Sequence, residues 1–182
     1  MNVLSFGASS SSTSINKKLA NYIAELITDS EKRHVDLNDY PLPLYCIDYE
    51  AKNGIPDNAK SFYENMEWAD VIVISFAEHN GTYTAVFKNI FDWVSRVKLK
   101  MFENKKLILL STAPGARGGQ TVLHAAIDRF PHHGAEIAGS LAFPFFTKNF
   151  SDEFGIIDEE IKSKVDSIIQ SISTQNLHSN SG

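Results

Sequence analysis

An apolar run at residues 70–76, Asp-Val-Ile-Val-Ile-Ser-Phe, constrains the fold more than any other feature of this sequence. The run is short, rich in β-branched residues and free of the polar alternation of a half-exposed strand, which predicts a central parallel strand covered on both faces. Apolar residues at helical spacing follow it and predict an amphipathic helix. These residues are Val86, Ile90, Trp93, Val94 and Val97. A buried strand joined to such a helix indicates an α/β fold.

The rest of the chain repeats this alternation of strands and helices. Apolar or β-branched runs predict further strands at residues 3–6, 33–37, 106–111 and 135–141. Helical spacing and helix start signals predict further helices at residues 15–27, 56–68, 121–130 and 156–172. Because parallel neighbours in a sheet need right-handed helical crossovers, this pattern predicts a doubly wound parallel sheet of five strands with helices on both faces.

Length and composition fit one domain of ordinary size. The chain has 182 residues, of which 43% are hydrophobic and 21% charged, a balance typical of globular proteins rather than disordered ones. We expect a single domain over residues 1–172, with residues 38–58 as a long structured loop and the small polar residues 173–182 as a disordered tail. An apolar stretch at residues 143–150 extends from the fifth strand.

The charge and hydropathy patterns argue against nucleic-acid and membrane partners. The net charge is -5, and no run of Lys and Arg forms a basic stripe. No segment approaches the ~20 apolar residues of a membrane span, and the N-terminus lacks the features of a signal peptide, so we expect a cytoplasmic protein. The single cysteine, Cys46, excludes an intramolecular disulfide, and we expect it to be a small packed side chain.

Three predicted loops stand out because of where they must lie. In a sheet of this kind, every loop that leads from a strand to a helix opens at the same edge, so loops far apart in the sequence become neighbours. The first loop (residues 7–16) is rich in Ser, the second loop (residues 78–82) contains an Asn-Gly pair, and the third loop (residues 112–119) is rich in Gly. Together they predict a ligand site at this edge.

The composition of the first loop favours a phosphate. Small hydroxyl side chains let backbone N–H groups approach an anion, and the N-terminus of the following helix adds positive potential. The loop lacks the Gly-Lys-Ser/Thr of a P-loop, and it lacks the dinucleotide fingerprint because Gly7 stands alone. A flexible Ser-rich turn that merely caps the helix is the alternative.

The second and third loops could line a flat group. Asn80 and Gly81 tolerate positive φ, and the hydroxyl of Thr82 could cap the helix that follows. In the third loop, glycines would let the backbone pack against a ring while Arg117 reaches an anion or the ring itself. Either loop, taken alone, could be an ordinary turn. A phosphate site with two such loops beyond it describes a mononucleotide such as FMN.

Four segments carry a resemblance to a known family. Residues 78–82 read Glu-His-Asn-Gly-Thr, residues 87–93 Phe-Lys-Asn-Ile-Phe-Asp-Trp, residues 14–16 Ser-Ile-Asn, and residues 114–119 Pro-Gly-Ala-Arg-Gly-Gly. They are similar to the second flavin loop and its helix, the phosphate loop and the third flavin loop of the NADPH-dependent FMN reductase family, a flavodoxin-like group that includes quinone, azo-dye and chromate reductases. The resemblance, over about residues 2–170, implies a flavodoxin-like three-layer sandwich with strand order 2-1-3-4-5.

The resemblance also implies an activity and a set of site residues. The implied reaction is hydride transfer from NAD(P)H through bound FMN to a quinone, a free flavin, an azo compound or a similar acceptor. Because the cofactor carries this chemistry, we expect no catalytic acid or base and no metal. The first-loop residues expected to hold the phosphate end are Ser9, Ser11, Ser14, Ile15 and Asn16. Those expected to meet the ring and ribitol are Ala77, Glu78, His79, Asn80, Gly81 and Thr82, and those expected to close the other side are Pro114, Gly115, Arg117, Gly118 and Gly119.

Four positions depart from the family pattern. Ala8 stands where the family usually has Gly, and Ser11 where it often has an Arg that faces the phosphate. Ala77 replaces a Pro, and His79 replaces a Tyr. Without the Arg, amides and hydroxyls at a helix N-terminus remain to hold the phosphate. The flat ring of His79 could lie along the flavin and adds an ionisable group there.

Two other functions stay open at this point, together with the oligomeric state. An electron-transfer protein of the flavodoxin type is one, although such carriers usually bear more negative charge than -5 to steer their partners. A related domain that has lost the flavin and serves in interactions is the other, and the missing Arg would fit it. We expect a homodimer or a dimer of dimers, formed through an apolar surface around Phe87, Phe91, Phe143, Phe145 and Phe146.

Overall fold

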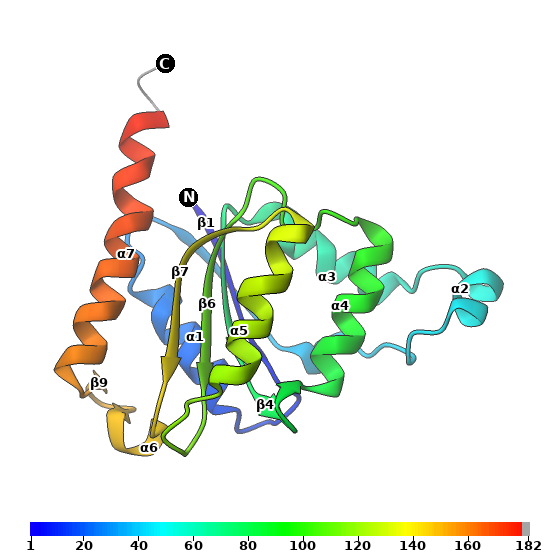
Figure 1. Ribbon diagram of the computed structural model, residues 1–182. Coiled ribbons are helices and arrows are strands. Elements are labelled where there is room, and N and C mark those ends of the chain that lie inside the picture. Colours follow the sequence, from blue (N-terminus) through cyan, green and yellow to red (C-terminus); the bar gives the residue numbers. More distant parts are fainter. Residues whose placement is uncertain (180–182) are drawn as a thin grey trace.

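The computed structural model describes residues 1–179 and is built around a five-stranded parallel sheet (Figure 1). Its strands lie in the order β2-β1-β3-β6-β7. Their bounds are β1 Asn2–Ala8, β2 Glu31–Val35, β3 Val71–Phe76, β6 Lys106–Thr112 and β7 Glu136–Phe143. Every pairing between them is parallel. The predicted fold class is confirmed. The predicted strand order 2-1-3-4-5 is confirmed as well, because β6 and β7 are the fourth and fifth strands of this sheet, and the other short strands form separate hairpins.

Helices cover both faces of this sheet, as Figure 1 shows. On one face lie α1 Ile15–Glu25 and α7 Glu159–Ser179, and on the other α3 Asp57–Trp68, α4 Ala85–Val97 and α5 Gln120–Arg129. Successive strand residues divide between two cores: Val71 and Val73 face α1 and α7, whereas Ile72 faces the other helices. Burial on both faces explains why residues 71–74 are all apolar.

The edge strand β2 is displaced from its predicted position at residues 33–37. Its pairing with β1 already begins at Glu31. Asp36 has left the strand and caps the 3-10 turn η1 (Leu37–Asp39). An edge strand that is largely exposed carries little apolar pattern, so its bounds could not be read from hydropathy.

The long loop predicted at residues 38–58 carries a helix and projects from the body. We call residues 41–56 the arm; it contains α2 (Ile47–Asn53), none of whose residues is buried. Figure 1 shows α2 standing away from the sheet and its helices. Cys46, just before α2, is exposed. The expectation of a packed cysteine is therefore wrong, because this part of the arm has no core to pack into.

Helix α4 holds the base of the arm. Asn89 Nδ2 donates to Pro43 O at 3.0 Å, and Trp93 Nε1 donates to the same carbonyl at 2.7 Å. Arg96 adds an ion pair with Glu50 at 3.0 Å. These three α4 residues are spaced at i, i+4 and i+7 and therefore share one helix face. The Asn and Trp of the family-like helix motif thus position the arm.

The chain after β7 differs most from the prediction. The short elements there are α6 Phe146–Asn149, β8 Phe150–Ser151 and β9 Gly155–Ile156. Helix α7 then runs from Glu159 to Ser179, so the tail predicted to be disordered from residue 173 is helical as far as Ser179. Each residue added to an existing helix gains a hydrogen bond, and no Gly or Pro interrupts this segment. Residues 180–182 of the predicted tail lie outside the described residues.

Most of the aromatic residues expected on a subunit surface are instead buried. Phe87, Phe91, Phe143 and Phe146 are at most 8% exposed, because they belong to the two cores that pack on the sheet. Of the five, Phe145 alone is exposed, at 42%. The prediction that these residues form an apolar subunit surface is therefore wrong. The large apolar side chains that the arm exposes are Leu44, Ile47 and Tyr49.

Candidate functional site

An open groove of about 250 Å³ lies where the three loops meet, at the carboxyl ends of β1, β3 and β6. These strands are neighbours in the sheet, which brings together loops that are far apart in the sequence. The groove is lined by Ser9, Ser11, Thr13, Ser14, Ile15, Asn16, Ala77, Glu78, His79, Thr112, Ala113 and Pro114.

The groove gathers part of the predicted site. Every first-loop residue in the prediction lines it, and so do Ala77, Glu78, His79 and Pro114. The predicted residues that do not line it are Asn80, Gly81, Thr82, Gly115, Arg117, Gly118 and Gly119. The lining residues that the prediction missed are Thr13, Thr112 and Ala113. Their signals were present: Thr13 belongs to the run of hydroxyl residues, and the other two directly precede Pro114.

The first loop delivers the N-terminus of α1 to the groove. Ser14 is the N-cap, and its Oγ accepts a hydrogen bond from Lys17 N at 3.1 Å. The N–H groups of Ile15 and Asn16 lie in the first turn and have no intrahelical acceptor. A Cβ on Gly7 would lie 2.3 Å from Lys17 N, so only glycine lets the helix begin this close to β1. The result is a helix terminus that can receive an anion.

Hydroxyl groups surround this helix terminus. Ser9 Oγ accepts a hydrogen bond from Ser11 N at 3.2 Å, and Ser11 Oγ lies 3.4 Å from Thr13 Oγ1. All three residues line the groove, and Ser11 and Thr13 are exposed. A hydroxyl can donate to an anion as well as accept from a neighbour. These side chains can therefore turn toward a ligand.

Asn16 ties the first loop to the sheet. Its side chain is buried, and Oδ1 accepts from Ser75 Oγ at 2.7 Å and from Thr112 N at 3.0 Å. Its Nδ2 donates to Thr112 O at 3.2 Å. The side chain thus joins α1 to the ends of β3 and β6. What Asn16 offers to an anion in the groove is chiefly its backbone N–H.

The second loop is a β-hairpin, and its helix cap differs from the predicted one. Strands β4 (Glu78–His79) and β5 (Thr82–Tyr83) pair around Asn80 and Gly81, whose φ angles are 52° and 75°. Such an Asn-Gly pair is typical of a tight hairpin turn. Thr82 pairs with His79, so the cap of α4 is Thr84, whose Oγ1 accepts from Phe87 N at 3.3 Å.

Glu78 connects the second loop with the third. Its Oε2 accepts a hydrogen bond from Val122 N at 3.0 Å, in the first turn of α5. The N-cap residue of this helix is Gly119, which has no side chain to do so. A carboxylate at a helix N-terminus satisfies a free N–H group and interacts favourably with the helix dipole. Glu78 therefore fixes the two loops relative to each other.

Gly118 and Gly119 in the third loop allow close packing against neighbouring strands and do not line the groove. Gly118 and Gly119 have φ angles of 57° and 76°, and a Cβ on Gly118 would lie 2.8 Å from the backbone of Phe143. The carbonyl of Gly118 accepts from Ser111 Oγ at 2.7 Å. Arg117 is exposed and donates to Thr121 Oγ1 at 2.7 Å on α5. Only the start of this loop, up to Pro114, lines the groove.

The groove offers N–H groups and hydroxyls rather than cations. Among the described residues that line it there is no Lys or Arg. Lys17, one turn into α1, is paired with Asp36 Oδ2 at 2.5 Å. Burial by itself would raise the pKa of Asp36, but the hydrogen bonds from Lys17 and Asn38 and the charge of Lys17 together outweigh it, so the pKa lies below its ordinary value. The positive charge of Lys17 is therefore already paired with a carboxylate.

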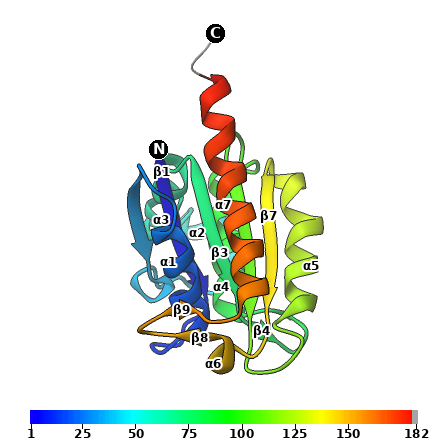
Figure 2. The ribbon, with the colours of Figure 1, turned by 90° about the vertical axis from the view of Figure 1, so that its left-hand side faces the viewer.

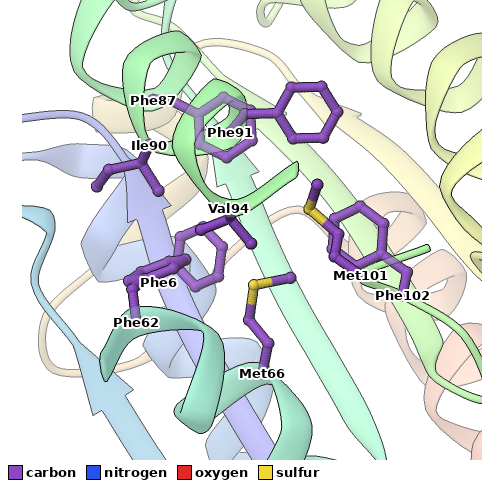
Figure 3. Close-up of a pocket in the computed structure, with 9 residues that line it drawn as sticks. All are labelled: Phe6, Phe62, Met66, Phe87, Ile90, Phe91, Val94, Met101 and Phe102. Atoms are coloured by element: carbon purple, nitrogen blue, oxygen red, sulfur yellow. The ribbon is translucent and has the colours of Figure 1, made fainter. Parts of the chain in front are cut away.

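A second hollow lies inside the core and is shown in Figure 3. Its volume is about 10 Å³, and its lining is apolar. The lining residues are Phe6, Phe62, Met66, Phe87, Ile90, Phe91, Val94, Met101 and Phe102. A space this small without polar partners holds neither a ligand nor an ordered water. It is a packing gap, and the groove is the candidate site.

The part of the chain that the structure describes contains neither a membrane-spanning helix nor a cluster of metal-ligating side chains. None of its helices is both long enough and apolar enough to cross a membrane. Within residues 1–179, His, Cys, Asp and Glu side chains form no group of three or more that could hold a metal ion.

The chain is similar to known oxidoreductases. The family described as NADPH-dependent FMN reductase matches residues 1–148. An NADPH:quinone oxidoreductase of Arabidopsis thaliana is 25% identical over 160 residues, which make up 81% of this chain and 76% of that protein. An NAD(P)H:quinone oxidoreductase of Solanum tuberosum is 30% identical over 115 residues, or 61% of this chain and 58% of that protein. The solved structure of FerB, a flavoenzyme NAD(P)H:(acceptor) oxidoreductase from Paracoccus denitrificans, matches with a TM-score of 0.73 at 21% identity and covers 95% of this chain and 97% of its own.

Proposed function

Because the chain belongs to the NADPH-dependent FMN reductase family, we propose that its groove binds FMN and that a quinone is the electron acceptor. The chain is an FMN-dependent NAD(P)H oxidoreductase. Bound FMN supplies the hydride chemistry in such enzymes, while the protein supplies binding and orientation. The quinone is inferred from the relatives in plants, whose names state that activity.

The observation that carries this proposal is the N-terminus of α1, whose first residues line the groove. The first-turn N–H groups of Ile15 and Asn16, with the hydroxyls of Ser9, Ser11 and Thr13, fit the oxygens of a phosphate. The close approach at Gly7 leaves no side chain between β1 and this terminus. The donor set therefore fits FMN although the usual Arg is missing.

The remaining walls fit a flat ring. Ala77 and His79 follow β3 and Pro114 follows β6, and none of the three needs to donate or accept a proton for binding. At about 250 Å³, the groove is slightly smaller than the ~300–1,000 Å³ usual for cofactor pockets. We infer that the phosphate and ribityl chain fill the groove, while the ring lies against its rim and keeps one face open to the second substrate.

The visible absorption spectrum tests the proposal. The purified protein, or the protein given FMN, should show bound flavin, and NADH or NADPH should bleach it until a quinone restores the colour. Bound flavin that neither nicotinamide bleaches would instead indicate an electron carrier. A protein that takes up no FMN would indicate an interaction domain.

A pair of neighbouring serines provides a matched test of the phosphate end. Ser11 lines the groove and Ser12 does not, although both are exposed residues of the same loop. Ser11→Ala should raise the Kd for FMN about 3–10-fold, as expected for one lost hydrogen bond. Ser12→Ala should leave it unchanged. Equal effects of the two substitutions would place the phosphate elsewhere.

We also propose that the chain forms a homodimer or a dimer of dimers, with the arm at the subunit contact. Leu44 and Ile47 are 81% and 71% exposed on an arm that α4 holds in place. Apolar side chains presented in this way mark an interaction surface. Light scattering should give at least twice the mass of the chain, and Ile47→Asp should lower it, whereas Leu99→Asp, at another exposed site, should not. A monomeric mass for the unaltered protein would refute the proposal.

A location of the protein in the cytoplasm stays a prediction.

A further inference from the structure

Phe145 adopts a backbone conformation that phenylalanine rarely takes. Its φ and ψ angles are 47° and 55°, in the left-handed region that glycine and asparagine enter easily and a bulky residue does not. Residues held in such conformations concentrate at functional sites, where the surrounding structure imposes them. Phe145 is also the exposed member of its aromatic stretch, since Phe143 and Phe146 are buried.

The surrounding hydrogen bonds impose this conformation. Phe145 N donates to Gly115 O at 3.1 Å, and Phe146 N donates to Ala113 O at 3.3 Å. The carbonyl of Phe145 accepts from Asn149 N at 3.0 Å, which closes the single turn of α6. All of these contacts use backbone atoms, so glycine at position 145 could make them without strain. The phenylalanine ring is therefore not needed to form this corner.

The corner lies beside the groove. Ala113 lines the groove, and Gly115 directly follows Pro114, which also lines it. The two backbone hydrogen bonds therefore attach Phe145 to the part of the third loop that forms one wall. Figure 2 shows α6 at the same edge of the molecule as β4, which carries Glu78 and His79.

We propose that Phe145 is a specificity-determining residue that provides a stacking surface for a planar second substrate, such as a quinone. This inference rests on the proposed function. An aromatic ring offers a flat apolar surface on which a conjugated ring stacks, and 42% exposure leaves that surface accessible. Lys148 Nζ lies over the Phe145 ring, 6.0 Å from its centre, so a positive charge is available at this surface for the oxygens of the same substrate. The left-handed backbone of Phe145 leaves its ring partly exposed next to the third loop.

The test compares Phe145→Ala and Phe145→Gly with Phe154→Ala. Phe154 is the matched control, because it is a 73% exposed phenylalanine in the turn between β8 and β9. Steady-state rates are measured with menadione, a planar quinone, and with ferricyanide, an acceptor that has no ring to stack. Both Phe145 variants should lose about tenfold in kcat/KM for menadione, through a higher KM, and less than twofold for ferricyanide. Phe154→Ala should match the unaltered protein with both acceptors.

Two further readouts separate substrate stacking from a structural role. The Kd for FMN should stay within twofold in both variants, and the Tm of Phe145→Gly should equal or exceed that of the unaltered protein, because glycine relieves the strained φ. Equal losses for the two acceptors, a weakened hold on FMN, a lowered Tm for Phe145→Gly or an unchanged KM for menadione would each overturn the inference. If the unaltered protein reduces no quinone, the proposed function fails first. Equilibrium binding of menadione to the FMN-loaded protein and its variants then decides the role of Phe145.

Discussion

The clearest quantitative prediction concerns Asn16, whose side chain joins α1 to the ends of β3 and β6. Asn16→Ala removes its hydrogen bonds to Ser75 Oγ, Thr112 N and Thr112 O. A buried hydrogen bond contributes about 1 kcal/mol net, so the three together contribute about 3 kcal/mol. For a chain of this size each kcal/mol lowers the Tm by about 2–4 °C. We therefore expect the Tm to fall by about 6–12 °C.

Urea unfolding of Asn16→Ala, Ser75→Ala and the double variant tests this value. Ser75→Ala alone loses one hydrogen bond and should cost about 1 kcal/mol. In the Asn16→Ala background the same change should cost almost nothing, because the hydroxyl of Ser75 has already lost its partner. The two substitutions should thus show a coupling free energy of about 1 kcal/mol. Asn16→Ala should also weaken FMN binding, since the first loop loses its attachment to β3 and β6.

Two results would refute this reasoning. A loss below about 1 kcal/mol for Asn16→Ala would mean that the three hydrogen bonds do not anchor the loop. Strictly additive effects would mean that Ser75 and Asn16 act independently, whatever their distance. Weakened FMN binding without any loss of stability would instead indicate that the side chain of Asn16 binds the phosphate directly.

Three further predictions concern single residues. Gly7→Ala should lower the Tm by about 4 °C or more, because a Cβ 2.3 Å from Lys17 N forces α1 to move; differential scanning calorimetry showing an unchanged Tm would contradict this. Burial raises the pKa of Tyr83 to about 12, and its hydroxyl has no partner among the described residues. In the unfolded chain this hydroxyl loses its proton at pH ~10. The contribution of Tyr83 to the free energy of unfolding is therefore fully present below that pH and is lost as the pH rises toward 12. In Tyr83→Phe the urea midpoint should fall less steeply with pH over this range than in the unaltered protein. An equally steep fall in the variant would show that Tyr83 does not cause the loss of stability. Cys46 is exposed in the single chain but lies in the arm next to Ile47, so the proposed subunit contact should slow its modification by Ellman's reagent, and equal rates for the unaltered protein and Ile47→Asp would contradict that contact.

The central strands and the site edge could be predicted because their signals are local. The run at residues 70–76 became β3, and the run at residues 106–111 became β6, each within one residue of its predicted bounds. A strand buried on both faces is apolar except where a hydrogen-bonded residue such as Ser75 occurs, so its pattern depends little on its neighbours. The three special loops followed from the rule that all strand-to-helix loops open at one edge.

Contacts between distant residues could not be predicted. Nothing near Glu78 in the sequence indicates that its carboxylate caps α5 at Val122. In the same way, Phe87 and Phe91 looked suitable for a subunit surface, yet both are buried. Periodicity identifies the apolar face of a helix, but it does not say whether the sheet or another subunit covers that face.

The sequence by itself determined the fold class, the sheet edge that carries the site and the family to which the chain belongs. It did so because hydrophobic period and short motifs are properties of neighbouring residues. Only the tertiary structure decided that Asn16 joins the loops from within, that the arm stands free with Leu44 and Ile47 exposed, and that Phe145 is held outward beside the groove. Each of these depends on hydrogen bonds or packing between segments that meet only when the sheet has formed. Such contacts produce no repeating pattern of residues in the sequence from which they could be predicted.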